Sequence, residues 1–482
     1  MLLHEIFKSS APDLIALKSG TLSITYKDLN QTVQKYRSYF ESIGMQSGEN
    51  VGLFYKNAPE FIYAYFAVVA LGAVVVPLNI MSTPSEIAYI AEDAKMKHLI
   101  TMTKLELAPQ YRQLVIPELE TAIHSTVITE QEVIARAEED VVVIIYTSGT
   151  TGFPKGAMLT HKNLCSNASC VADYLSMTTK DSVLCVLPMF HSFAWTVSVL
   201  TSLMVGSTIV IMDAFLPKEV LQTIQGEQIT IVSGVPAMYN YYLMVGTKAI
   251  FATVRLFISG GAALPVQVLE NFKKKFDLKI FEGYGLSEAS PVVSINPLDD
   301  TRAGSIGKAL PGISVKIVDE HGNQLPNGKP GELLVMGPNV MKGYLNLPEV
   351  SSNTIKDGWL HTGDVAYIDD EGYIYIVDRI KDIVIVSGLN VYPREIEETL
   401  YQYDGVIEAA VIGVPDQKKG ESLLAFIVVA DGKPFNLSDL KKHLTDRTAS
   451  FKLPRKIIVR ESLPKNATGK IMKKLLKEEF SY

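Results

Sequence analysis

Apolar and polar residues along the first 140 positions follow helical and strand periods in turn. Three short apolar runs predict strands, and three longer segments with apolar residues every three to four positions predict helices. Alternation of this kind is typical of a parallel or mixed sheet covered by helices. The expected elements are a helix that opens at 26–29, a strand at 50–55, a helix at 59–71, a strand at 74–76, a helix at 83–94 and a strand at 98–101.

The alternation continues to about residue 281, and after residue 380 the pattern becomes that of a small α+β unit. We therefore expect the α/β fold class, with a large domain at 1–380 and a small domain at 381–482. The large domain should continue with strands at 141–146, 182–187, 207–211, 229–233, 256–259 and 279–281 and helices at 196–204, 217–225 and 265–276. The small domain should contain helices at 393–401, 437–444 and 471–479 and strands at 408–412, 423–429 and 456–460.

Two long apolar runs, 64–78 and 183–212, raise the question of membrane spans. The run 64–78 is interrupted by Gly72 and Pro77 and is too short to cross a bilayer. The run 183–212 contains His191 and several serines and threonines. Both runs are better explained as buried core, and we expect no transmembrane segment and no signal peptide.

Composition excludes several classes of function. The chain has 482 residues, 47% of them apolar and 20% charged, which is ordinary for a globular protein. Its formal net charge of -7 argues against a nucleic-acid-binding protein. The three cysteines, Cys165, Cys170 and Cys185, lie in apolar surroundings, which favours inert thiols in a reduced, cytoplasmic protein over a catalytic thiol.

Segment 146–156, Tyr-Thr-Ser-Gly-Thr-Thr-Gly-Phe-Pro-Lys-Gly, is the strongest candidate for chemistry. It lies between the predicted strand 141–146 and a predicted helix for which Thr160 is a suitable N-cap. Glycines let backbone N–H groups approach an anion, and hydroxyls and a lysine add donors, so the segment predicts a polyphosphate site. The expected ligands of the β- and γ-phosphates are Thr147, Ser148, Gly149, Thr150, Thr151 and Lys155.

Two other interpretations of this segment are weaker. It is not a Walker A loop, because Lys155 follows Pro154 rather than glycine. A solvated linker is the other possibility, but linkers rarely join a buried strand to a capped helix.

Two glycine-containing turns after predicted strands could bind a nucleotide base. Segment 259–263, Ser-Gly-Gly-Ala-Ala, would let a flat ring lie against the backbone, although it could also be only a tight turn. Segment 282–288 places Tyr284 between two glycines, where its ring could stack on adenine, and Glu288 offers a hard oxygen ligand for Mg²⁺. Taken alone, this second segment would more often be a surface turn. The residues expected to contact the nucleotide here are Gly261, Ala262, Gly283, Tyr284, Gly285 and Ser287.

Two further turns carry charged residues suited to a ribose or a phosphate. In His361-Thr-Gly-Asp364, a carboxylate placed by a turn could bind both ribose hydroxyls. In segment 378–382, Arg379 could reach the same ribose or the α-phosphate.

These segments, together with Gly331-Glu-Leu, Gly343-Tyr344 and segment 464–470, occur in the order and approximate spacing of the adenylate-forming superfamily. The chain resembles this superfamily from about residue 15 to its end, and the branch it is most similar to is that of acyl-CoA synthetases. It departs from the pattern at Ser287, where relatives often have threonine, and at Glu282, where many have glutamine. Neither change removes a required group.

The resemblance implies a large N-terminal adenylate-forming domain of helix-covered sheets and a small mobile α+β C-terminal domain that acts as a lid. Lys381 corresponds to the hinge, and Lys470 to the lysine that bridges the carboxylate and the α-phosphate. Without the resemblance, Lys470 would be interpreted as a solvated lysine in a basic tail. Gly388 corresponds to the position that lines the pantetheine channel. ATP, Mg²⁺ and CoA are the implied co-substrates and metal.

The acid substrate is less well defined by sequence. Segment 188–195, Pro-Met-Phe-His-Ser-Phe-Ala-Trp, is similar to the superfamily's aromatic-His motif, so His191 is expected beside the acid and counted with Lys470 and Glu288 as catalytic. Relatives that activate amino acids have an aspartate where this chain has His191, so an α-amino acid is disfavoured. The expected acyl pocket is His191, Trp195, Val235, Gly260 and Val292, and core packing is the alternative for its apolar members.

We therefore expect an ATP-dependent carboxylic acid–CoA ligase that acts through an acyl-adenylate on a medium- to long-chain fatty acid or an aryl acid. One alternative is an acyl-AMP ligase that loads an acyl carrier protein. Fatty-acid members of that class often have an insertion in the large domain, which is not evident between Gly343 and His361. The other alternative is a non-catalytic nucleotide-binding module. The sequence leaves acyl length and oligomeric state, monomer or homodimer, open.

Overall fold

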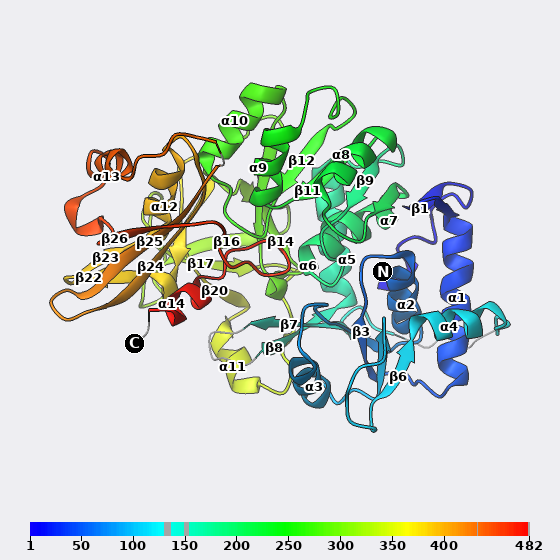
Figure 1. The fold of residues 1–482 in the computed structure, drawn as a ribbon. Coiled ribbons are helices and arrows are strands. Elements are labelled where there is room, and N and C mark those ends of the chain that lie inside the picture. Colours follow the sequence, from blue (N-terminus) through cyan, green and yellow to red (C-terminus); the bar gives the residue numbers. More distant parts are fainter. Residues whose placement is uncertain (130–135, 149–153, 431, 481–482) are drawn as a thin grey trace.

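The computed structural model describes residues 1–129, 136–148, 154–430 and 432–480, and its described strands form four sheets (Figure 1). Three sheets belong to a large body built from the chain up to Arg379, and the fourth belongs to the C-terminal unit. This arrangement confirms the predicted α/β fold with a large N-terminal part and a small α+β C-terminal part.

The first sheet has nine strands, and its long central run from β1 to β13 is parallel. Parallel strands are covered on both faces and therefore appear in the sequence as continuous apolar runs. This is why the sequence located β9, β11 and β12 closely. The order is β15 (Lys308–Ala309), β14 (Val292–Ile295), β13 (Ile280–Gly285), β12 (Leu256–Ser259), β11 (Ile231–Gly234), β9 (Ser182–Cys185), β10 (Thr208–Ile211), β1 (Ile15–Ser19) and β2 (Leu22–Thr25).

The second sheet has seven strands and carries the phosphate-loop segment between two of them. Its order is β18 (Gly343–Tyr344), β8 (Pro154–Thr160), β7 (Val141–Ser148), β4 (Val74–Pro77), β3 (Asn50–Phe54), β5 (His98–Thr101) and β6 (Arg112–Val115).

Strand β8 was not predicted from the sequence, which indicated no element between residue 156 and the helix capped by Thr160. Residues 154–160 instead pair antiparallel with β7 and bury Ala157 and Leu159. The segment contains a proline, a lysine and a glycine, which are uncommon within strands, so its sequence did not indicate a strand. The described residues at both ends of the 146–156 segment therefore lie in paired strands, and helix α5 (His161–Tyr174) begins directly after Thr160, as predicted.

The start of α5 agrees with the sequence. Thr160 is the N-cap: its hydroxyl accepts a hydrogen bond from the N–H of Asn163, and the Asn163 side chain accepts from the N–H of Thr160. This reciprocal pair satisfies two N–H groups that lack helical partners. The hairpin and the helix are thereby joined without a flexible segment.

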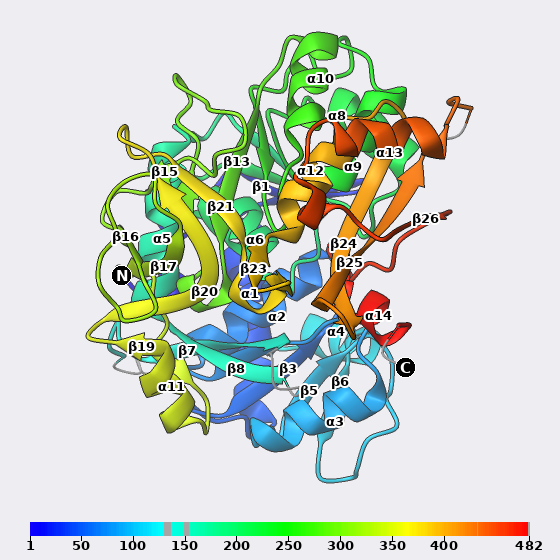
Figure 2. The same cartoon turned by 90° about the vertical axis from the view of Figure 1, so that its left-hand side faces the viewer.

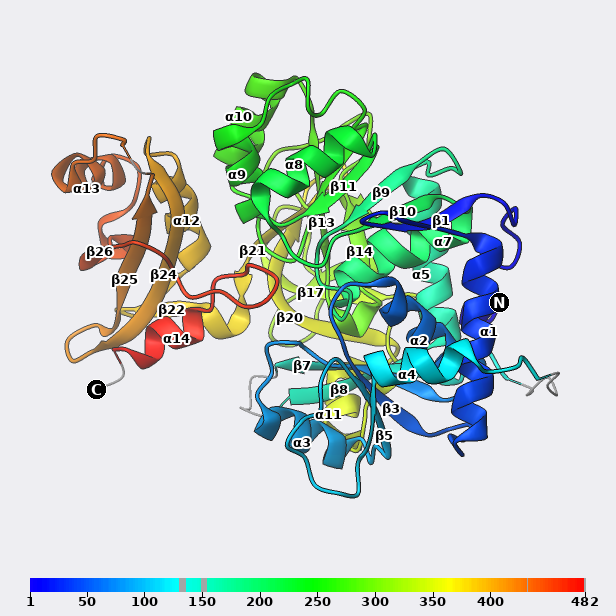
Figure 3. The same ribbon diagram turned by 45° about the vertical axis from the view of Figure 1, so that its right-hand side comes forward.

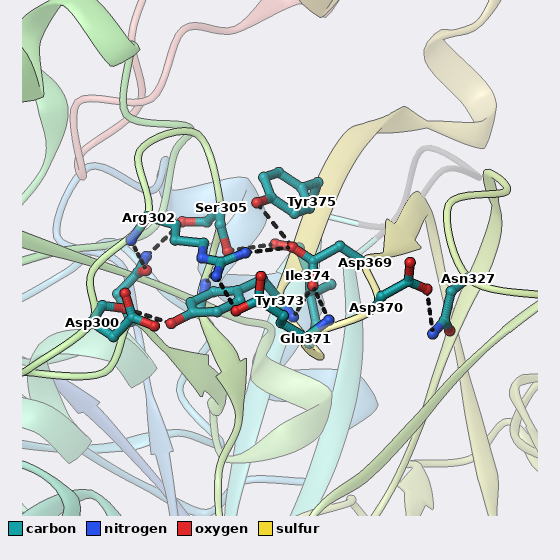
Figure 4. A network of polar contacts seen from close by, with 12 residues as sticks. Asp300, Arg302, Ser305, Asn327, Asp369, Asp370, Glu371, Tyr373, Ile374 and Tyr375 are labelled. Carbon is teal, nitrogen blue, oxygen red and sulfur yellow. Dashed lines mark hydrogen bonds and ion pairs between the residues drawn. The ribbon is translucent and has the colours of Figure 1, made fainter.

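The third sheet was not predicted as a unit, although it carries two expected site residues. Figure 4 shows how its β20–β21 turn is attached to the loop after β14: Arg302 contacts Asp369 and Glu371, and the Tyr373 hydroxyl donates to the carbonyl of Asp300. These contacts fix the third sheet against the first. Its strands are β16 (Ser314–Val318), β17 (Gly331–Met336), β20 (Trp359–Ile368), β19 (Ile355–Lys356) and β21 (Ile374–Arg379).

The C-terminal unit has its own sheet and two apolar clusters that contain only residues after Asp382. Figure 2 views the molecule from the side of this unit, and Figure 3 shows a red loop that extends from it toward the large body. Lys381 lies in the short helix η4 (Ile380–Asp382) between the two parts. The strands are β23 (Leu389–Val391), β22 (Val384–Val386), β25 (Gly420–Val429), β24 (Val406–Asp416) and β26 (Lys456–Arg460).

Most predicted helices are present with small shifts at their ends, whereas α4, α9 and α11 were not predicted from the sequence. Residues 192–205 form one helical segment with a π-helical middle, where the sequence predicted a helix at 196–204. Besides α5, the described helices of the large body are η1 (Leu3–Glu5), α1 (Tyr26–Ser42), α2 (Pro59–Ala70), α3 (Pro84–Asp93), α4 (Ile116–His124), α6 (Ser192–Ala194), η2 (Trp195–Leu200), α7 (Thr201–Val205), α8 (Pro217–Gly226), α9 (Pro236–Val245), α10 (Val266–Phe276), η3 (Ser287–Ala289) and α11 (Pro348–Thr354). In the C-terminal unit they are α12 (Pro393–Tyr401), α13 (Leu437–Thr445), η5 (Ser450–Lys452) and α14 (Lys473–Glu478).

The two long apolar runs pack inside the large body. Helix α2 is buried along nearly its whole length, and the segment from β9 to β10 contributes to several apolar clusters. Within the described ranges, no helix combines the length and the apolar character that a membrane crossing requires. The three cysteines are free, and burial raises the pKa of Cys165 and Cys185 to about 12, so both remain un-ionised thiols.

The N-terminal segment docks on the first turn of α5 through a histidine. The N–H of Leu3 donates to Nδ1 of the buried His161, at 3.0 Å. His4 lies beside it, with the two ring centroids 6.4 Å apart. Burial lowers the pKa of both imidazoles to about 4, so both are neutral at physiological pH.

Acidification should therefore destabilise the large body. In the unfolded chain a histidine has a pKa of about 6.5, so below that pH the unfolded state binds more protons than the native state. The contribution of each histidine to the free energy of unfolding is complete above pH 6.5 and is lost as the pH falls toward 4. Between pH 7 and pH 5 this loss is about 2 kcal/mol per histidine. Urea unfolding at pH 7 and at pH 5 would measure this change in the free energy of unfolding.

Two variants provide the comparison. His161→Gln keeps an acceptor for the Leu3 N–H and should lose part of the pH dependence, whereas His321→Gln, whose side chain is 76% exposed, should not. An unchanged pH dependence in His161→Gln would contradict the assignment.

Candidate active site

The β7–β8 hairpin carries the base of the predicted phosphate site. Thr147 and Lys155 face each other across the two strands. The ammonium of Lys155 lies 5.5 Å from the centroid of the Tyr344 ring, a distance typical of a cation–π contact. Of the other predicted phosphate ligands, Ser148 is placed as the last residue of β7, and Gly149, Thr150 and Thr151 lie outside the described residues.

Glu288 points toward this hairpin from η3. Its Oε1 accepts hydrogen bonds from the Tyr344 hydroxyl at 2.9 Å and from the Thr147 hydroxyl at 3.4 Å. Burial and the charge of Glu288 raise the pKa of Tyr344 above its ordinary value, so the phenol remains a donor. The carboxylate is thus oriented beside the predicted phosphate ligands.

This arrangement fits a Mg²⁺ ion that arrives with a nucleotide. Magnesium is usually bound by one or two carboxylates together with phosphate oxygens and water. Across the described ranges, no group of three or more histidine, cysteine, aspartate or glutamate side chains could form a site by itself. Glu288 supplies the single carboxylate that such a shared site needs.

Tyr284 and Asp364 form the second part of the site. Tyr284 lies in β13, and its hydroxyl donates to Asp364 in β20. Burial and the nearby Asp364 charge raise the pKa of Tyr284 far above its ordinary value. Asp364 itself is 6% exposed, so little of this residue is in contact with solvent.

Arg379 joins Asp364 from the neighbouring strand. The two residues are directly opposed in the β20–β21 ladder, and Nε of Arg379 lies 3.3 Å from Oδ1 of Asp364. The sequence predicted both residues for one ribose or α-phosphate, and the hairpin brings them together.

Turns around Tyr284 require glycine at two positions. A Cβ on Gly285 would lie 2.0 Å from the carbonyl oxygen of Pro291, and Gly261 has a φ of +77°. Gly283 lies beside Tyr284 in β13, Ala262 follows Gly261 in the turn after β12, and the Ser287 hydroxyl is 3.2 Å from that of Ser192. This last contact connects the Glu288 turn to the aromatic-His motif.

Lys470 reaches the large body from the C-terminal unit. Asn466 shapes its turn, because Oδ1 of Asn466 accepts from the N–H groups of Thr468 and Lys470. A Cβ on Gly469 would lie 3.3 Å from Val235, which places this loop against the start of α9. Burial and the charge of Arg379 lower the pKa of Lys470 to about 8, so the ammonium predominates at pH 7.

His191 lies close enough to Lys470 for their charges to interact. Burial and the Lys470 ammonium lower the pKa of His191 to about 4, so the imidazole is neutral. Its Nδ1 accepts from the N–H of Phe193 at 3.3 Å. The proton of the neutral ring is therefore assigned to Nε2, which can donate one hydrogen bond.

The predicted acyl-pocket residues fall into two groups. Val235 lies against the Lys470 loop at Gly469, and Gly260 lies against Phe193, whose ring a Cβ on Gly260 would meet at 3.0 Å. Trp195 and Val292 are buried in apolar clusters.

Trp195 lines a small cavity together with Phe190 and Ser192, the chain neighbours of His191. Its ring centroid lies 4.1 Å from that of Tyr65, and Phe61 and Phe66 pack on the same ring. The cavity has about 10 Å³, which is room for one water molecule. It is lined by Tyr65, Pro77, Val143, Ile145, Leu164, Met189, Phe190, Ser192, Trp195 and Thr196.

Gly388 lies far from these groups along the chain, in the turn between β22 and β23. Its φ is +83°, and a Cβ added there would meet no atom within 4 Å. The position is therefore open in this arrangement of the two parts.

Sequence reasoning missed two residues that organise the site. Tyr344 was noticed in Gly343-Tyr344 but given no role, and Asn466 was noticed only as part of the turn that contains Lys470. A polar residue within a short turn is the available signal for Asn466. The contact of Tyr344 with Glu288 joins residues 56 positions apart, and no local pattern indicates it.

Comparisons with known proteins agree with this geometry. The family described as AMP-binding enzyme matches residues 6–345, and the AMP-binding enzyme C-terminal domain matches residues 395–470. A long-chain-fatty-acid–CoA ligase of Bacillus subtilis is 33% identical over 99% of this chain and 94% of its own. A feruloyl-CoA synthase of Amycolatopsis sp. is 35% identical over 98% of this chain and 96% of its own.

A solved protein has the same arrangement of the two parts. ATP-bound MatB from Rhodopseudomonas palustris is 32% identical, matches 100% of this chain and 99% of its own, and superposes with a TM-score of 0.93. The apo crystal structure of that protein covers the same shares of both chains but superposes with a TM-score of 0.83.

A Tyr344→Phe variant should bind Mg²⁺ together with a nucleotide more weakly. The phenol orients the Glu288 carboxylate, and loss of such an outer contact typically weakens metal binding by about tenfold. Calorimetric titration of Mg²⁺ in the presence of saturating ATP would measure the affinity. Tyr284→Phe is the matched control, because it removes a hydroxyl from Asp364 instead; an equal Mg²⁺ effect in both variants would contradict the assignment.

Proposed function

The chain belongs to the family of AMP-binding enzymes, in its acyl-CoA synthetase branch, and we propose that it activates a medium- to long-chain fatty acid. As an acid–thiol ligase it joins a carboxylic acid to CoA at the expense of ATP. An acyl-adenylate forms first, and the CoA thiol then displaces AMP. The observation that carries the proposal is the convergence of Lys470 from the C-terminal unit on His191, Asp364 and Arg379 of the large body.

The first step must bring a carboxylate to the α-phosphate of ATP, although both are negatively charged. The carboxylate oxygen forms a bond to the α-phosphorus as the bond to the β-phosphate bridging oxygen breaks, and pyrophosphate leaves. Positive groups on both sides of the α-phosphate stabilise the transition state. We assign Lys470 to the carboxylate and α-phosphate, and Lys155 with Thr147 to the departing pyrophosphate.

The nucleotide would be oriented by Tyr284, Asp364 and Arg379. Tyr284 offers its ring to adenine, and Asp364 offers its carboxylate to the ribose hydroxyls with Arg379 beside it. Glu288 would hold a Mg²⁺ ion that neutralises charge on the phosphates.

His191 suits a place beside the acid because it is neutral. An uncharged Nε2–H donor can orient a carboxylate oxygen without forming a permanent ion pair that would hold the product. The chain offers no acidic side chain at this position to pair with an α-ammonium group, which supports an acid without an amino group.

Trp195 is proposed as the gate of the acyl pocket. The cavity behind it is too small for an acyl chain, so a long substrate requires the indole to move from its contact with Tyr65. The similarity to a long-chain-fatty-acid–CoA ligase supports a fatty acid as the substrate, and the similarity to a feruloyl-CoA synthase supports an aryl acid as the second candidate.

We further propose that residues 381–482 form a lid that turns about Lys381 between the two steps. The higher similarity to the ATP-bound than to the apo structure of MatB supports the view that the present arrangement is that of the adenylation step. The exposed Gly388 would then approach the site only after rotation. The low reactivity of the buried thiols supports a cytoplasmic enzyme that needs no disulfide.

A panel of fatty and aryl acids tests the proposal. Pyrophosphate release should require both ATP and an acid, and CoA should convert the adenylate to a thioester. Lys470→Ala should slow the release by about 100- to 1000-fold, as expected when one charged group at the transition state is removed. Lys474→Ala, a lysine 74% exposed in the same tail, should have no effect.

Three outcomes would lead to other conclusions. Full turnover in Lys470→Ala would refute the assigned mechanism. Transfer to an acyl carrier protein but not to CoA would favour an acyl-AMP ligase. Binding of ATP without acid-dependent pyrophosphate release would indicate a non-catalytic module.

Gly388→Leu should separate the two steps. A bulky side chain in the proposed pantetheine channel should leave pyrophosphate exchange intact while slowing thioester formation. Gly388→Ala is the matched control, because it carries the strain of a positive φ with little added volume. Equal loss of both half-reactions in Gly388→Leu would show that Gly388 does not line the channel.

A further inference from the structure

Helix α9 lies at the boundary between the large body and the C-terminal unit and contacts that unit at two positions. The side-chain amide of Asn240 donates to the carbonyl of Ile407, in β24, at 3.1 Å. Val235, the residue before the helix, lies against Gly469. The two positions are five residues apart, which is about 7.5 Å along a helix axis. Asn240 has no part in the chemistry assigned above.

Another side of α9 is anchored inside the large body. Tyr239, next to Asn240, is completely buried, and its hydroxyl donates to the carbonyl of Ile258 at 2.7 Å. Its ring packs edge-on against Phe272, with the two centroids 5.8 Å apart. A helix that is packed in this way stays with the large body when the C-terminal unit moves. Asn240 is therefore a fixed donor, and its bond to Ile407 requires β24 to lie beside α9.

Strand β24 also supports the hairpin that carries Lys470. Glu408 follows Ile407 in this strand and forms an ion pair with Lys465, at the base of the hairpin. Lys465 is paired with Ile471 in an antiparallel bridge, so the two sides of the hairpin are joined at this base. A contact that holds Ile407 therefore holds the strand to which the base of the hairpin is attached.

The tip of the same hairpin lies against the start of α9. A Cβ on Gly469 would lie 3.3 Å from Cγ2 of Val235, and a Cβ on Gly261 would lie 3.8 Å from Cγ1 of the same side chain. Val235 is thus in contact with the residue that precedes Lys470 and with the turn expected to contact the nucleotide. Contacts at the base and at the tip together orient the hairpin relative to that turn.

We propose that Asn240 is a positioning residue for the adenylation step: it docks the C-terminal unit on α9 through the carbonyl of Ile407 and thereby places Lys470 at the nucleotide. This inference rests on the proposed function, because it requires the unit to leave α9 before the thioester forms. A single neutral hydrogen bond suits such a contact, since water replaces it when the unit moves away and its net contribution is small.

The two half-reactions, measured separately, test the role of Asn240. Asn240→Ala should slow acid-dependent pyrophosphate exchange about fivefold, which corresponds to about 1 kcal/mol. Thioester formation from presynthesised acyl-adenylate and CoA should keep its rate, because that step does not use the docked arrangement. Asn240→Asp should slow pyrophosphate exchange further, because it places an acceptor against the Ile407 carbonyl.

Asn271→Ala is the matched control. Asn271 is an exposed asparagine of α10, and its side chain accepts from Gln267 of the same helix. This variant should change neither half-reaction. Equal slowing of both half-reactions in Asn240→Ala, or a rate of pyrophosphate exchange equal to that of wild-type protein, would overturn the proposal.

A second comparison tests whether Asn240 acts through Lys470. Lys470→Ala removes the group that Asn240 is proposed to position, so Asn240→Ala should cause no further loss of pyrophosphate exchange in that background. A merely structural role would slow the reaction in both backgrounds. A further fivefold loss in the Lys470→Ala background would therefore overturn the proposal.

A distance measurement distinguishes failure of this inference from failure of the proposed function, because it needs neither acid nor CoA. Spin labels at Lys218→Cys in α8 and Lys441→Cys in α13, both exposed positions, report by pulsed electron paramagnetic resonance how the two parts lie. The partly buried Cys170 is replaced by serine to prevent its labelling. With ATP present, Asn240→Ala should raise the ratio of undocked to docked molecules about fivefold, and Asn271→Ala should not.

Each result of the distance measurement decides the docking role. Identical distance distributions in Asn240→Ala and in the otherwise unchanged protein would overturn it, even if no acid supported pyrophosphate exchange. A shifted distribution, in a protein that showed no acid-dependent exchange, would support docking by Asn240 and refute the proposed function instead.

Discussion

Two anions must meet in this active site, and the architecture follows from that constraint. The acid carboxylate and the triphosphate repel each other, and their approach requires positive groups that are already in place. Lys155 comes from the second sheet, Arg379 from the third and Lys470 from the C-terminal unit. No single element carries enough charge, so the fold gathers it from separate parts of the chain.

Cations that are gathered in one place repel one another, and nearby carboxylates reduce this repulsion. Asp364 lies against Arg379, and Glu288 lies beside the hairpin that carries Lys155. Each carboxylate receives a hydrogen bond from a tyrosine whose pKa is raised by burial, so neither phenol loses its proton to its neighbour. The carboxylates are thus oriented by neutral donors and remain able to bind a nucleotide or a metal ion.

Hydrogen bonds join the C-terminal unit to the large body at several described positions. Asn240 donates to the carbonyl of Ile407, and Val266 donates to Glu398. Polar contacts of this kind exchange readily with water, so each contributes little net stability.

The sequence predicted those features that depend on neighbouring residues in the chain. Strands β5, β12 and β26 and helix α12 were located at their ends, because apolar runs and helical periods are properties of neighbouring residues. Strand β8 and the third sheet were missed, since their pairing is with distant strands and their own patterns are weak. The described site residues Thr147, Glu288, Tyr284, Asp364, Arg379 and Lys470 were all named from their motifs. The role of Tyr344 depends on its contact with Glu288, a residue far from it in the chain.

The sequence by itself determined the chemistry available to this protein: a hydroxyl- and glycine-rich loop with a lysine, an aromatic residue between glycines, and single carboxylates and cations in turns. Only the tertiary structure decided which of these groups lie within reach of one another and which of them are charged. Hydrogen bonds, burial and electrostatic interactions act over a few ångströms in space, and residues that share a hydrogen bond are separated by as many as 253 positions along the chain. Residue type is local information, whereas proximity and desolvation are not.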